Sequence, residues 1–168
     1  MIIVRAFAVL LTASAALGAA QAPGGAAPAP EPRGRAVLDG FVLGPPPPHL
    51  GPHVSDFAYE WGGVAFRSRV WERGPDSSGA THVDLTAEVL RGAKLSDPAA
   101  LRGFLARYLE KPAETWHPRL SRGRPGFAGG DDAFFLDRPG VAVYARLEKP
   151  GADPGLLRQF MDGVRRDV

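Results

Sequence analysis

The chain has 168 residues, of which 45% are hydrophobic, and its 20 basic side chains nearly balance 18 acidic ones. This balance argues against a strongly charged partner such as nucleic acid. Because the chain has no cysteine, it has no disulfide framework, and its stability has to come from a hydrophobic core.

Residues 1–20 have the pattern of a secretory signal peptide. Arg5 supplies positive charge, residues 6–17 are small or apolar, and the small residues Gly18, Ala19 and Ala20 come next. We therefore predict cleavage after Ala20, with a second possible site ending at Ala22. The alternative, an uncleaved membrane anchor, needs about 20 apolar residues, more than this run offers. The predicted location is extracytoplasmic, either secreted or in the cell envelope, with no transmembrane span after cleavage.

Residues 21–49 are rich in Ala, Pro and Gly and end near a run of four prolines, 45–48. This composition favours an extended, semi-rigid linker. A short apolar stretch, 37–43, interrupts the linker and is expected to pack as an edge strand on the folded domain. A single folded domain is predicted for residues 50–168.

The first part of this domain has the alternating pattern of β-strands. Residues 54–61 and 64–71 flank a Gly62-Gly63 turn, which predicts a hairpin with Trp61 opposite Val64 and Ala58 opposite Arg67. Residues 81–90 alternate in the same way and predict a third strand.

Two helices and a second hairpin complete the prediction. An Asp-Pro pair, the pattern of an N-cap followed by a first helical residue, opens each helix at Asp97 and Asp153. The hairpin joins residues 133–137 and 141–148. The predicted fold class is α+β, an antiparallel sheet of about five strands in the order β-β-β-α-β-β-α, with both helices packed on one face.

Such an arrangement leaves the other sheet face open. The predicted binding residues on that open face are Arg67, Arg69, Trp71, Phe135 and Tyr144. Our leading hypothesis is a non-catalytic binding or interaction domain whose open face or sheet edge meets an envelope or extracellular protein, or a cell-wall component. We assign no catalytic residue, metal ligand or cofactor, and the sequence leaves the oligomeric state open.

The alternative hypothesis is a small extracellular hydrolase. His82 and Asp84 lie two apart on one strand and are a possible base and orienting group, and Asp131-Asp132 is a possible carboxylate pair. Cross-strand pairing with arginine explains the first pair without any function. Adjacent residues at a strand entry point to opposite faces, which argues against the second. A hydrolase requires these residues to converge.

One segment is locally basic, and it contains His117, Arg119, Arg122 and Arg124. Contact with phosphates or acidic polymers is one interpretation, and we favour a solvated loop because the rest of the chain is nearly neutral. Motifs for phosphate binding, dinucleotide binding and serine or zinc hydrolysis are absent from the sequence.

Two stretches, Phe57-Ala58-Tyr59-Glu60-Trp61 and the segment from Gly130 to Val143, resemble small secreted or envelope proteins of high-GC bacteria. The resemblance implies an exported domain of the kind found in surface or regulatory proteins. It transfers no catalytic residue.

Overall fold

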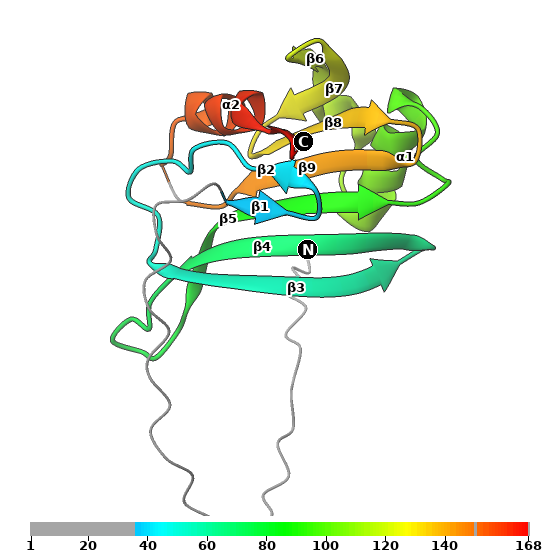
Figure 1. The fold of residues 1–168 in the computed structure, drawn as a ribbon. Helices are drawn as coiled ribbons and strands as arrows, with labels where there is room; N and C mark the ends of the chain where they lie inside the picture. Colours follow the sequence, from blue (N-terminus) through cyan, green and yellow to red (C-terminus); the bar gives the residue numbers. More distant parts are fainter. Residues whose placement is uncertain (1–35, 150, 168) are drawn as a thin grey trace, which may run out of the picture. The chain divides into compact units, whose positions relative to one another are not determined.

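A seven-stranded antiparallel sheet organises the chain, with strand order β3-β4-β5-β9-β8-β7-β6. The computed structural model describes residues 36–149 and 151–167, so the predicted signal peptide lies outside the described residues. The strands are β3 (His53–Trp61), β4 (Val64–Arg73), β5 (His82–Arg91), β6 (His117–Ser121), β7 (Arg124–Gly129), β8 (Asp132–Arg138) and β9 (Val141–Leu147). Strands β3 and β6 are the two edges of the sheet (Figure 1).

One face of the sheet is covered by helix α2 (Pro154–Gly163) and by a small second sheet. The small sheet pairs β1 (Val37–Leu38) and β10 (Arg165–Arg166) with β2 (Phe41–Val42) between them. We call this side the α2 face. Phe41 and Phe160 are both buried there, next to Trp71 of the main sheet.

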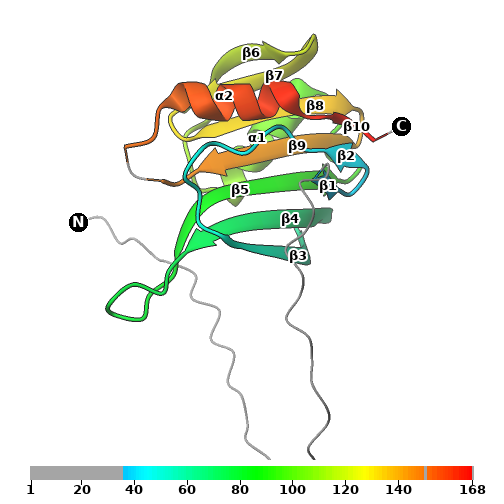
Figure 2. The ribbon, with the colours of Figure 1, turned by 60° about the vertical axis from the view of Figure 1, so that its left-hand side comes forward.

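The opposite face is covered by helix α1 (Pro98–Tyr108) and by the short 3-10 helix η1 (Ala113–Thr115), and we call it the α1 face. Leu101, Phe104 and Leu105 of α1 pack against Phe66 and Phe134 of the sheet. Figures 1 and 2 show the two helices on opposite sides of the main sheet.

The predicted fold class is therefore wrong. The main sheet has seven strands rather than five, a second three-stranded sheet is present, and the two helices do not share a face. The physical reason is that the central strands are apolar on both sides: five consecutive residues of β8 and of β9 are buried. Each face has to be covered, since exposed apolar area is unfavourable.

The fold also begins earlier than residue 50. Leu38, Phe41 and Leu43 are buried in the core of the α2 face. The apolar stretch 37–43 does pack on the domain, as β1 and β2 of the small sheet rather than as an edge strand of the main one.

Strands β6 and β7 fall in a segment whose sequence is irregular for a strand, because each contains a proline and β7 also contains two glycines. A turn at Arg122 and Gly123, both with positive φ, joins them. The sequence prediction missed this hairpin because proline and glycine weaken a strand pattern.

The local predictions based on turn and cap chemistry are confirmed. Trp61 pairs with Val64 and Ala58 with Arg67, and Gly62 and Gly63 both have positive φ. The side chains of Asp97 and Asp153 accept hydrogen bonds from the first turns of α1 and α2. Pro139 and Gly140 connect β8 and β9, within the predicted turn at 138–140.

Phe160→Ala is expected to destabilise the fold. The Phe160 ring is fully buried and meets the Trp71 ring edge-on at 6.1 Å, so its loss leaves a cavity and lowers the free energy of unfolding by about 3–5 kcal/mol. Urea denaturation followed by circular dichroism measures this. Leu120→Ala is the control, because Leu120 is 67% exposed. Equal stability of the two variants would contradict the packing of α2.

Candidate functional site

The five residues predicted for an open sheet face do not form one surface. Trp71 and Phe135 are buried on the α2 face, whereas Tyr144 is buried on the α1 face. Arg67 is exposed, and Arg69 is half-buried beside it. Because both faces are covered at their centre, the accessible side chains of the sheet lie mainly on its edge strands, β3 on one side and β6 on the other.

His82 and Asp84 do not form a pair. The His82 ring nitrogen Nε2 lies 2.9 Å from Asp76, and this interaction lowers the pKa of Asp76. Asp84 is fully buried, where it accepts hydrogen bonds from Arg73 at 2.7 Å and from the Gly51 backbone at 2.9 Å. The two side chains thus belong to separate local contacts.

Asp131, in the turn before β8, is exposed, whereas Asp132, the first residue of β8, is buried. Asp132 accepts from Lys111 at 2.5 Å, Trp116 at 3.2 Å and Tyr144 at 2.8 Å. These bonds attach the segment after α1 to the sheet. Among residues 36–149 and 151–167, no three side chains gather as a metal site requires.

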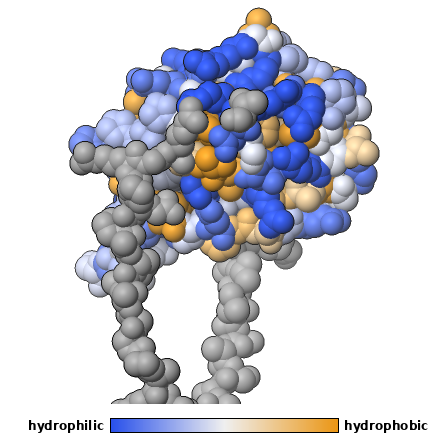
Figure 3. Space-filling view, in the orientation of Figure 1, coloured by the Kyte–Doolittle hydropathy of each residue, from blue (hydrophilic) through white to orange (hydrophobic). Residues whose placement is uncertain are grey.

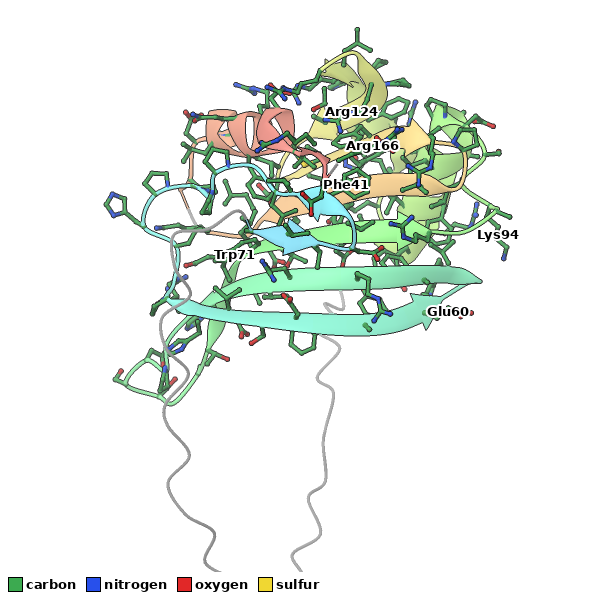
Figure 4. The ribbon with its side chains drawn as sticks, viewed as in Figure 1. Phe41, Glu60, Trp71, Lys94, Arg124 and Arg166 are labelled. Carbon is green, nitrogen blue, oxygen red and sulfur yellow. The ribbon has the colours of Figure 1, made fainter. Side chains whose placement is uncertain are left out.

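The predicted basic loop is the β6–β7 hairpin, and its arginines are largely engaged in holding the C-terminal segment. Arg119 pairs with Asp162 at 2.7 Å, and Arg124 donates to the Val164 carbonyl at 2.7 Å. Figure 4 shows Arg124 close to Arg166, which pairs with Asp137 at 2.9 Å. Hydrophilic residues predominate on this upper part of the molecule, below a small hydrophobic tip (Figure 3). The contacts account for these arginines as structural residues.

The most distinctive exposed feature of the described chain is the edge strand β3. It is nine residues long and contains no proline. Eight of its residues are exposed, and the exposed fraction is 50% for Val54, 53% for Phe57 and 39% for Trp61. The sequence predicted this strand as half of a hairpin. It becomes a candidate site because it lies at the edge of the sheet. That position depends on the order of the later strands, which the sequence pattern does not give.

The backbone of β3 is available for pairing. In a two-residue hairpin the closing residues, here Trp61 and Val64, form a hydrogen-bonded pair. Pairs alternate along an antiparallel ladder, so the N–H and C=O groups of every second residue point away from β4. These outward groups belong to Val54, Asp56, Ala58 and Glu60.

The other edge is closed to pairing by its sequence. Ser121 and Arg124 close the β6–β7 hairpin, so the backbone nitrogen of Pro118 points outward on β6. A proline nitrogen has no hydrogen to donate, and proline at this position blocks the addition of a strand. The main sheet thus has one blocked edge and one open edge.

Aromatic contacts hold β3 rigidly. The Trp61 ring lies 5.4 Å from Phe104 and 5.3 Å from Tyr108, both of α1. Tyr59 stacks on Phe66 at 4.8 Å between ring centroids. An ordered edge loses less conformational entropy when a partner binds.

Tyr59 also connects the edge to a buried carboxyl group. Its hydroxyl donates to Glu88 at 2.6 Å and lies 2.6 Å from the Tyr108 hydroxyl. Glu88 is only 4% exposed, and burial raises its pKa to about 7 despite the hydrogen bond from Tyr59. Burial and the adjacent Glu88 charge raise the pKa of Tyr59.

On the α2 face, charged side chains of β3 and β4 lie next to the open edge. Asp56 binds Arg69 through two hydrogen bonds of 2.7 Å. Arg67, the next arginine along β4, has no hydrogen bond or ion pair in the described part of the chain. It lines a groove with Asp56 and Ala58 on one side and with Leu38 and Asp39 of the β1–β2 turn on the other. A partner placed along β3 would approach this cation.

No protein-family model matches this chain, and no curated protein or solved structure is similar enough to be named as a relative. Within the described residues, neither helix has the length and apolar character needed to cross a membrane.

Glu88→Gln is expected to change how stability depends on pH. Because the pKa of Glu88 rises from its ordinary 4.5 to about 7 on folding, the folded chain binds more protons than the unfolded chain between these values. The contribution of Glu88 is thus most favourable below pH 4.5 and is lost as the pH rises to 7. Glutamine still accepts from Tyr59 and does not ionise.

The unfolding free energy of Glu88→Gln relative to the unchanged chain should therefore increase by about 1–3 kcal/mol between pH 4 and pH 8. Urea titrations at each pH measure it. Glu60→Gln, at the exposed end of β3 (Figure 4), is the matched control. A difference that does not vary with pH would show that Glu88 ionises normally.

Proposed function

We propose that this protein is an exported, non-catalytic interaction domain that binds an extended segment of a second polypeptide chain along β3. In strand addition, the incoming backbone completes the hydrogen bonds of an open sheet edge, and flanking side chains supply specificity. The observation that carries the proposal is a long, exposed and proline-free edge on a sheet whose other edge is blocked by Pro118.

The chemistry of the edge favours a peptide partner. Alternating N–H and C=O groups match another peptide backbone, whereas a cell-wall glycan offers no such repeat. Asp56 and Glu60 are two of the β3 residues whose backbone groups point to the open edge. Their charges disfavour a partner with acidic residues opposite them. These charges also limit non-specific association of the edge.

The proposed site of action is the cell envelope or the extracellular space. Support comes from residues 1–20, whose charge, apolar run and small terminal residues are typical of a signal peptide. The partner is then an envelope or extracellular protein.

Ala58→Pro is expected to abolish strand addition without breaking the β3–β4 hairpin. The N–H of Ala58 points to the free edge, so proline removes a donor that only a partner uses. The measurement is capture of partners by the tagged protein from its native envelope and culture fluid, with crosslinking and mass spectrometry. We expect a saturable partner to be lost with Ala58→Pro.

Ala58→Thr is the matched control, because threonine changes the same side chain and keeps the N–H. It should retain the partner. Equal capture by Ala58→Pro and the unchanged chain would place the binding surface elsewhere and overturn the proposal. Circular dichroism of both variants checks that the hairpin is intact.

A further inference from the structure

The residues of β3 are complementary to the same strand in a second copy. If two copies pair antiparallel with Phe57 opposite Phe57, all nine residues of each strand find a partner. Asp56 then lies opposite Ala58, and Glu60 opposite Val54. No two like charges are opposed in this register.

The neighbouring registers are unfavourable. The two nearest registers that keep the side chains of both copies on matching faces are centred on Asp56 or on Ala58 instead of Phe57, so that this residue lies opposite its own copy. The first places Asp56 against Asp56, and the second places Asp56 against Glu60 twice. Like charges directly opposite each other destabilise a strand pair, so charge selects the register centred on Phe57.

Hydrogen-bond geometry agrees with this register. The outward groups of β3 belong to the even-numbered residues, and these residues pair with each other when Phe57 is the centre. Each of the four pairs exchanges two backbone bonds, about eight in total. Phe57 itself falls at a non-hydrogen-bonded position, where side chains are closest.

The exposed arginine supplies a further contact. Arg67 is the neighbour of Ala58 on β4, and in this register Asp56 of the second copy lies on the other side of Ala58. The small alanine side chain leaves room for the long arginine to reach across it. Arg67, which has no ion pair within the described residues, thereby faces an acid.

We propose that the partner of β3 is β3 of a second copy, so that two chains join antiparallel about Phe57 into one continuous sheet. This proposal rests on the proposed function, because it names the strand that the open edge binds. It predicts an isologous contact, in which the same residues of both copies take part.

The absence of cysteine from the chain permits a direct test. In the full chain, Phe57→Cys places two thiols across a non-hydrogen-bonded pair with Cα atoms about 4.5 Å apart, within disulfide range. Mild oxidation should give a covalent dimer on a non-reducing gel. Ser55→Cys is the control, because its two copies lie about 13 Å apart along the strands and should not crosslink.

Sedimentation equilibrium of the full chain without cysteine measures the association itself. We expect a dimer that Ala58→Pro converts to a monomer and that Arg67→Glu weakens at least about tenfold. Arg158→Glu, an exposed change on α2, should have no effect.

Two results would overturn the proposal: equal crosslinking of Ser55→Cys and Phe57→Cys, or a monomer at every concentration. A monomer that still captures another protein, in a manner lost with Ala58→Pro, would reject the second copy and retain strand addition. A monomer without such capture would reject both.

Discussion

The need to bury both sides of the central strands governs this structure. Ala87 and Val89 of β5 face the α2 layer, while Leu90 of the same strand faces α1. Neither helix alone is able to cover the sheet, so the molecule has a layer on each face. The small sheet of β1, β2 and β10 supplements α2 where that helix does not reach.

This double burial ends before the edge of the sheet is reached. On the α2 face of the central strands the side chains are apolar. At the corresponding positions of β3 and β4 they are charged, namely Asp56 and Arg67. On the other side, Trp61 and Tyr59 still contact α1. β3 is thus fixed from one face and accessible from the other and from its edge. A strand in this position is both ordered and available, which is the combination that recognition by strand addition requires.

Local chemistry could be predicted from the sequence, and long-range arrangement could not. The Gly62-Gly63 turn, the Asp97 cap and the Asp153 cap each depend on neighbouring residues only. The side on which a helix packs depends instead on strands far away in the chain. Glu88 illustrates the difference, because its polarity predicts exposure, whereas in the fold it is buried and accepts a hydrogen bond from Tyr59.

The same distinction explains the candidate site. The residues of the β3 hairpin and their register were predictable from alternation and turn type. Its position at an edge depends on β9 pairing with β5, a contact between segments about 55 residues apart that no local pattern encodes.

The small sheet also joins two segments that lie far apart in the sequence. Val42 pairs with Arg165, so residues near the beginning of the described chain are completed by residues near its end. Contacts of such high sequence separation form slowly and only after the last residues are available. The small sheet is therefore expected to form late in folding, after β5, β8 and β9 have built the surface on which it packs.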